Sequence, residues 1–98
     1  MKVRYSRRAL LELEGIHSYI SQFNPRAAAD VVSRIEGLCT MLGDFPGMGH
    51  STERSDLRML PVVRYPYVIF YTPLQENDEI LILRIRHGRR SPLSPSDI

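Results

Sequence analysis

The apolar residues of this chain follow two periods, and the change between them separates helices from strands. Residues 2–5 alternate polar and apolar side chains, which predicts a short first strand. Over residues 9–23, and again over 25–42, apolar residues recur every three or four positions, the period of one helix face. Ser6 and Asn24 are suitable N-caps, Pro25 suits a first helical position, and Gly43 a C-terminal cap. The tight link between the two segments predicts an antiparallel helical hairpin.

Alternation resumes after residue 56 and predicts three more strands. Residues 57–63 and 79–87 alternate, whereas every residue of 67–71 is apolar or aromatic, as in a central strand covered on both faces. Pro61 implies an edge or a bulge in the first of these strands. Residues 44–56 and 72–78 show neither period and are predicted loops. The first loop is long enough to be a candidate contact surface.

The order of these elements predicts an α+β fold. An N-terminal strand and a helical hairpin precede an antiparallel three-stranded meander, and the helices should pack on one sheet face. A chain of 98 residues is expected to form one domain over residues 1–98, with residues 91–98, rich in Ser and Pro, as a loosely held tail. Cys39 lies in an apolar stripe and is expected to be a buried hydrophobe. No apolar run is long enough to span a membrane, and the first residues lack a signal peptide, so we expect a cytoplasmic protein without a membrane partner.

The net charge is only +2, but the basic residues gather at the two ends of the sequence. They are Lys2, Arg4, Arg7 and Arg8 at the start, and Arg84, Arg86, Arg89 and Arg90 at the end. If the ends meet, they form a cationic patch, although a solvated face explains the same charges equally well. Strict alternation over 79–87 predicts a face that begins apolar and ends cationic, with Ile80, Ile82, Arg84 and Arg86 on it and Leu81, Leu83, Ile85 and His87 opposite.

Several short segments, taken together in their order and spacing, resemble the ParE branch of the ParE/RelE toxin superfamily. They are residues 6–13, 19–20, 24–28, 45–49, 57–58, 65–71 and 82–90, so the resemblance extends from Val3 to Arg90. It implies a plasmid-stabilisation toxin of a type II toxin–antitoxin operon, neutralised by a small bound ParD-like antitoxin. ParE-like members are associated with poisoning DNA gyrase, whereas RelE-like members cut messenger RNA on the ribosome. Both functions share one fold, so the fold cannot choose between them.

RNA cleavage through a 2′-hydroxyl needs a base, a cation for the transition state and an acid. Arg58, Arg84 and Arg86 are candidate cations, and His87 is the candidate acid or base, because histidine is the side chain most often used for proton transfer. The set is incomplete beside the nuclease branch, because no tyrosine follows Tyr71 and because glycine stands at position 88. His87 falls on the face of Leu81 and Leu83, so it is better explained as a residue that caps the edge of the core or makes a single structural hydrogen bond. We therefore expect no catalytic residues, and we keep a ribosome-dependent nuclease as the alternative.

The non-enzymatic hypothesis requires only a binding surface. Its candidate target-binding residues are Arg84, Arg86, His87, Arg89 and Arg90, which would hold gyrase or its DNA complex by charge. Candidate antitoxin contacts are Leu10, Leu13 and Leu60, although apolar residues in such a periodic stripe more often belong to the core.

We expect no cofactor and no metal, because His17 and His50 lie on different elements without paired ligand spacing. Glu12 and Glu14, two apart on a helix, point in different directions and are predicted to be solvated surface residues.

Overall fold

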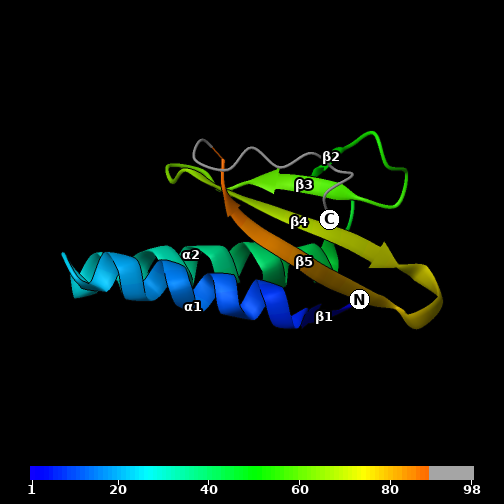
Figure 1. Cartoon of the computed structure of the whole chain (residues 1–98). Helices are drawn as coiled ribbons and strands as arrows, with labels where there is room; N and C mark the ends of the chain where they lie inside the picture. The colour runs from blue at the N-terminus through cyan, green and yellow to red at the C-terminus, as the bar shows by residue number, and fades with distance from the viewer. Residues whose placement is uncertain (89–98) are drawn as a thin grey trace.

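The computed structural model describes residues 1–88 and shows two helices packed on one face of a five-stranded sheet (Figure 1). The elements are β1 (Lys2–Tyr5), α1 (Arg7–Ser21), α2 (Pro25–Asp44), β2 (His50–Ser51), β3 (Arg58–Pro61), β4 (Tyr67–Leu74), the 3-10 turn η1 (Gln75–Asn77) and β5 (Glu79–His87). The strand order is β1-β5-β4-β3-β2, with β1 parallel to β5 and all other pairs antiparallel. The predicted α+β class, helical hairpin and meander are confirmed.

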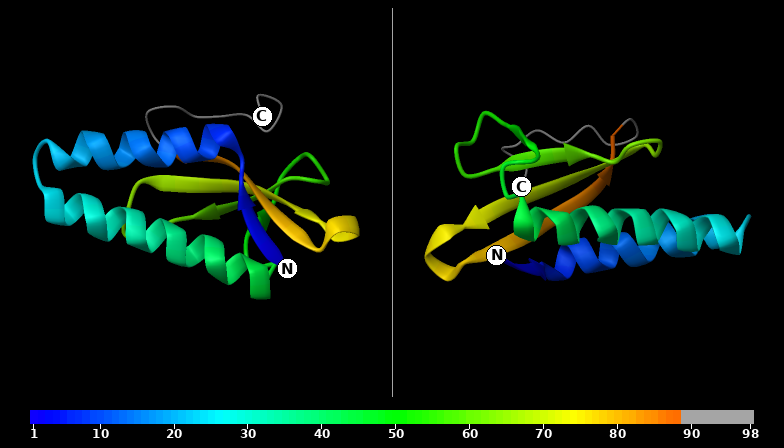
Figure 2. Two further views of the ribbon diagram at one scale, coloured as in Figure 1. Left: turned by 90° about the horizontal axis from the view of Figure 1, so that it is seen from below. Right: turned by 180° about the vertical axis from the view of Figure 1, so that it is seen from behind.

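Both helices begin where the sequence predicts. The Ser6 side chain accepts a hydrogen bond from the Ala9 N–H, and the Asn24 side chain accepts one from the Ala27 N–H. The predicted end of α2 is wrong, because Gly43 lies inside the helix and Phe45 is its C-cap. A Cβ atom at Gly43 would lie 2.6 Å from the Met1 carbonyl oxygen, so this glycine permits close packing and does not end the helix. Figure 2 shows the N-terminus beside this end of α2.

The sheet contains more strand than the sequence predicts. Residues 50–51 of the predicted loop form β2, which pairs with β3 only at Arg58 and Met59. Pro61 is the last residue of β3 and lies beyond the pairing with β2. The sheet therefore does not need the backbone N–H that proline lacks. Residues 72–74, predicted as a loop, extend β4, and β4 is the central strand as expected. Asp78 closes the turn into β5 with a left-handed backbone conformation.

A bulge in β5 changes which of its residues face the helices. Phe70 pairs with Arg84 and the next residue, Tyr71, pairs with Ile82, so Leu83 is an extra residue in the ladder. Ile85 therefore joins Ile80 and Ile82 in the core beneath the helices. The predicted face of Ile80, Ile82, Arg84 and Arg86 is wrong, because strict alternation cannot anticipate the extra residue.

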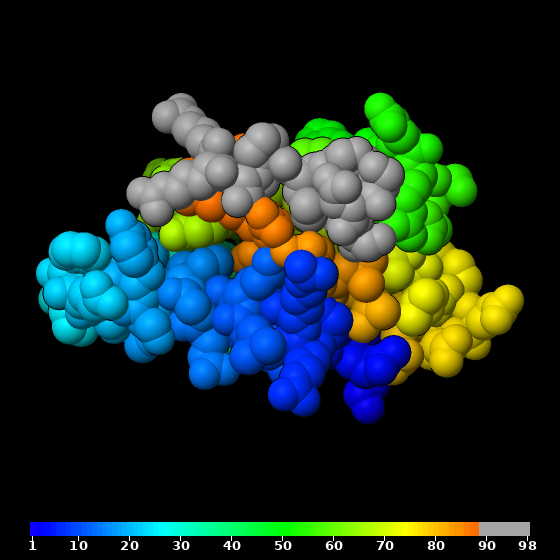
Figure 3. Space-filling view, in the orientation of Figure 1, coloured from blue at the N-terminus to red at the C-terminus, as the bar shows by residue number. Residues whose placement is uncertain are grey.

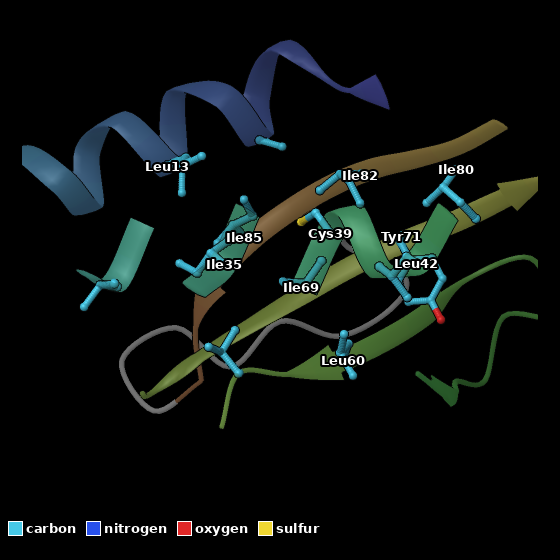
Figure 4. Close-up of a cluster of buried hydrophobic side chains, with 13 residues drawn as sticks. Leu13, Ile35, Cys39, Leu42, Leu60, Ile69, Tyr71, Ile80, Ile82 and Ile85 are labelled. Atoms are coloured by element: carbon cyan, nitrogen blue, oxygen red, sulfur yellow. The ribbon is translucent and has the colours of Figure 1, made fainter. Parts of the chain in front are cut away.

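The core lies between the helical hairpin and the sheet (Figure 4). Cys39 is fully buried there, as predicted, beside side chains from α1, α2, β3, β4 and β5. Burial raises the pKa of the Cys39 thiol to about 11, and burial also raises the pKa of Tyr5, which hydrogen-bonds to it. Within residues 1–88, neither helix is long and apolar enough to cross a membrane.

Candidate functional site

The end of β5 carries the candidate cations, but Arg84 does not face solvent. Its side chain is 5% exposed, and the guanidinium binds the Glu12 carboxylate of α1 through two nitrogens. Arg84 Nε lies 3.1 Å from Oε1 and Nη2 lies 2.8 Å from Oε2. This bidentate geometry is the strong form of the arginine–carboxylate pair. Arg84 is therefore enclosed by the fold, and it is not available as part of an exposed cationic edge.

Glu12 has a structural role that the sequence analysis missed. Besides binding Arg84, it accepts a hydrogen bond from the Ile85 N–H at 2.9 Å, and Arg86 Nε lies 3.9 Å away. Our prediction that Glu12 is a solvated surface residue is therefore wrong. A sequence signal existed, because Glu12 follows Ala9 by three positions and precedes Ile16 by four, which places it on the buried side of the helix.

The remaining described residues at the end of β5 are only partly enclosed. The side chain of Arg86 is 22% exposed and lies within ion-pair distance of Glu12. His87 is half-buried, and its ring makes an edge contact with Tyr67 at a centroid distance of 5.6 Å. Arg89 and Arg90, the other two candidate target-binding residues, lie outside the described residues. The described part of this surface therefore consists of Arg86, His87 and their neighbours.

One of these neighbours, Arg64, was not anticipated. It lies in the turn between β3 and β4, is exposed, and has a positive φ of 76°. The N–H of Gly88 donates a 2.7 Å hydrogen bond to the Pro66 carbonyl, which ties this turn to the end of β5. A hollow lined by Arg64, Tyr65, Tyr67 and Gly88, among others, lies at the same place. Only the fold brings the turn that carries Arg64 to the end of β5, so composition and spacing gave no signal for it.

Arg58, the remaining candidate of the nuclease alternative, lies elsewhere. Arg58 pairs with Tyr71 across the sheet, and Tyr71 belongs to the core under the helices. Arg84 pairs instead with Phe70, one residue away on β4, so Arg58 and Arg84 point to opposite faces. The Arg58 guanidinium donates to the carbonyls of Gly47 and Gly49 in the loop after α2. The four nuclease candidates therefore do not converge on one site.

The candidate antitoxin contacts divide into exposed and buried residues. Leu13 and Leu60 are 7% and 9% exposed and belong to the core, as the alternative interpretation had it. Leu10 is 49% exposed and lines a shallow groove with Leu13, Glu14, His17 and Val32. Within residues 1–88 no three His, Cys, Asp or Glu side chains gather as metal ligands would.

Comparison with known proteins identifies the family. Residues 3–92 match the family model described as the ParE toxin of the type II toxin–antitoxin system parDE. The chain belongs to the ParE toxin family. It is 37% identical to Toxin RelE2 of Caulobacter vibrioides over 89 residues, which cover 91% of this chain and 97% of that protein.

Two solved structures share the fold of this ParE-family chain. A chain of the chromosomal ParDE system from P. aeruginosa matches with a TM-score of 0.77 and 26% identity, covering 89% of this chain and 95% of that one. The isolated E. coli RelE toxin matches with a TM-score of 0.71, covering 93% and 87%, but at 14% identity it shows the fold alone. The chain is thus the toxin of a type II toxin–antitoxin system of the ParE/RelE superfamily.

Proposed function

We propose that this toxin acts by binding DNA gyrase through the end of β5, as a stoichiometric poison that cleaves no RNA. The observation that carries the proposal is the separation of Arg58 from Arg84. Acid–base cleavage of a phosphodiester needs its cations and its proton carriers within hydrogen-bond reach of one phosphate. Here Arg58 is held by two loop carbonyls on one face, while Arg84 is held by Glu12 and points to the other face.

A binding surface demands less of the same residues. Arg86 and His87 lie next to the β3–β4 turn, where Arg64 forms no ion pair with any described residue. In the sequence, Arg89 and Arg90 follow directly. A cluster of cations attracts an acidic protein surface or a DNA backbone, and it binds without any bond being broken. This explains why so small a chain could act without a catalytic set.

Neutralisation by a ParD-like antitoxin is the second part of the proposal. The groove beside Leu10 is largely apolar and is lined by residues of both helices of the hairpin. An amphipathic helix of the antitoxin would bury its apolar face there, as peptides do in other helix-binding grooves. The ParDE system to which this chain is similar supports such a partner.

The experiment is induction of the chain in cells without antitoxin, scored for gyrase–DNA complexes and for cut transcripts. We expect trapped covalent gyrase–DNA complexes and intact ribosome-bound transcripts. The purified chain should likewise trap gyrase on DNA in proportion to its concentration. Transcript cleavage by purified chain and ribosomes, without trapped gyrase, would refute the proposal and favour the nuclease alternative with Arg58, Arg84, Arg86 and His87 as its residues.

Charge reversal provides a matched test of the surface. The double variant Arg89→Glu/Arg90→Glu should lose gyrase trapping while it still folds and binds antitoxin. The control is Arg26→Glu/Arg34→Glu, which makes the same change in net charge at two exposed positions of α2. Equal loss of trapping in both variants would indicate a general charge effect and would count against a specific surface at the end of β5.

A further inference from the structure

The edge of β5 changes its partner halfway along the strand. β1 pairs with β5 only as far as Ile82, after which the chain turns into α1. The Ser6 N–H donates to the Ile82 carbonyl at 2.9 Å, and the Ser6 hydroxyl donates to the Leu83 carbonyl at 2.8 Å. One step further, Glu12 accepts the Ile85 N–H. Polar groups of Ser6 and Glu12 thus replace the strand that β5 lacks there, and Figure 3 shows α1 lying against this part of β5.

The same carboxylate contacts three successive residues. It accepts hydrogen bonds from the guanidinium of Arg84 and the N–H of Ile85, and it lies within ion-pair distance of the guanidinium of Arg86. These three residues follow the bulge at Leu83 directly. The extra residue of a bulge turns every later side chain of the strand to the other face, so the direction of residues 84–86 depends on keeping this register. Contacts directly after the bulge at Leu83 therefore help to hold this register.

We infer that Glu12 is a positioning residue, which fixes residues 84–86 after the bulge and thereby directs Arg86 toward the target. This inference rests on the proposed function in so far as Arg86 belongs to the binding surface. Glu12 itself is 20% exposed and does not need to touch the target. It acts through the strand, by holding the main chain at Ile85 and the side chains on either side of it.

The first test needs no target. In Glu12→Ala the Ile85 N–H loses its acceptor, so its amide hydrogen should exchange at least tenfold faster than in the wild type. In Glu12→Gln the amide oxygen still accepts from Ile85, but the charge that holds Arg86 is gone. The ¹⁵N heteronuclear NOE of Arg86 Nε should then fall to the value of the exposed Arg64. The matched control is Glu14→Gln, an exposed position of the same helix, which should leave both signals unchanged.

The second test measures gyrase trapping in a double-mutant cycle. Glu12→Gln should reduce potency about tenfold in the wild-type background and should have no further effect in Arg86→Gln, because the two residues act together. Glu12→Gln leaves the buried charge of Arg84 unpaired and should lower the melting temperature. Neutralising both partners in Glu12→Gln/Arg84→Gln should restore the melting temperature without restoring potency. Recovery of potency in that variant would show that Glu12 merely neutralises Arg84, and would overturn the inference.

The two proposals fail separately. If the wild-type chain traps no gyrase, the proposed function is wrong, while the exchange rate at Ile85 and the NOE at Arg86 still decide the role of Glu12. If Arg86 stays equally ordered in Glu12→Gln, positioning by Glu12 is refuted whatever the target.

Discussion

Tyr71 holds the loop after α2 against the sheet with a single hydroxyl group. Its oxygen accepts the Gly49 N–H at 2.9 Å and donates to the Pro46 carbonyl at 2.8 Å. A Cβ atom at Gly49 would lie 2.7 Å from this same oxygen, so the glycine is needed for the contact. Packing against Tyr71 thus explains the glycine at position 49 of the Phe-Pro-Gly-Met-Gly segment, whereas Phe45 is 60% exposed.

Tyr71→Phe removes this hydroxyl and should destabilise the fold by about 1 to 3 kcal/mol, because the buried Gly49 N–H loses its acceptor. Urea denaturation of the two proteins measures the difference. Tyr65→Phe serves as the control, since the Tyr65 side chain is half-buried and packs against the core. Similar losses in both variants would show that the Tyr71 hydroxyl contributes nothing specific.

Cys39 predicts how stability depends on alkaline pH. Burial raises the pKa of its thiol from an ordinary value of 9.0 to about 11 in the folded chain. The unfolded chain therefore loses this proton first, so the contribution to stability is complete below pH 9 and is lost between pH 9 and 11. Two pKa units correspond to about 2 to 3 kcal/mol. Because the pKa of Tyr5 is also raised, the decline should continue above pH 11.

The measurement is urea denaturation at intervals from pH 8 to 11, with Cys39→Ala as the control. The variant should be less stable at pH 8, because a buried side chain has been shortened, but its stability should fall less between pH 9 and 11. Parallel curves for the two proteins would show that the thiol does not contribute to the pH dependence.

The roles of single residues could be predicted from the sequence where they are local, and could not be predicted where they depend on partners far away in the chain. Ser6, Asn24 and Pro25 act on the backbone within three residues, so their capping roles were predictable. Glu12 and Arg84 are 72 positions apart, and only the docking of α1 on β5 brings them together. The place of Arg64 was likewise not predictable, because the turn that carries it reaches the end of β5 only through a contact made in the folded chain.

At the scale of elements, α2 carries two glycines with opposite requirements. Gly43 faces the start of β1, where a Cβ atom would lie 2.6 Å from the Met1 carbonyl oxygen and 3.2 Å from a methyl group of Val3. Gly37 has no atom within 4 Å of the position that a Cβ would take. The same substitution should therefore have opposite effects at the two sites.

Gly43→Ala should destabilise the fold by about 1 to 3 kcal/mol, because the start of β1 must move away from α2. Gly37→Ala should stabilise it by up to about 1 kcal/mol, because alanine favours the helix and meets nothing. Thermal denaturation of the two variants beside the wild type makes the comparison. A stabilising Gly43→Ala would show that β1 is not fixed against α2.

The helices and the meander were predictable because their periods of apolar residues extend over many positions, whereas the irregular parts of the sheet were not. The bulge at Leu83 leaves no mark in an alternating sequence, since it only becomes visible against the partner strand. β2 has two exposed residues and no apolar pattern, so its pairing with β3 could not be predicted from the sequence. The bulge nevertheless decides which way the arginines of β5 point.

At the scale of the whole molecule, the groove beside Leu10 and the end of β5 are separate surfaces formed by different elements. The groove beside Leu10 is lined by residues of α1 and α2, whereas the proposed target surface is formed by β5 and the β3–β4 turn. An antitoxin bound in the groove could still silence the toxin, because α1 holds the end of β5 through Glu12. Binding and activity should therefore be separable by substitution.

Leu10→Glu should weaken antitoxin binding about tenfold or more, because a carboxylate replaces a leucine that the partner would bury, a loss of at least about 1.5 kcal/mol. The control is Leu11→Glu, which makes the same change at a residue of similar exposure, 56% against 49%, that does not line the groove. Calorimetric titration with the antitoxin measures both variants, and thermal denaturation verifies that both fold. Gyrase trapping without antitoxin should stay unchanged in Leu10→Glu, since the end of β5 is intact. If Leu11→Glu weakens binding as much as Leu10→Glu, the antitoxin covers a different part of α1 and the groove is not its site.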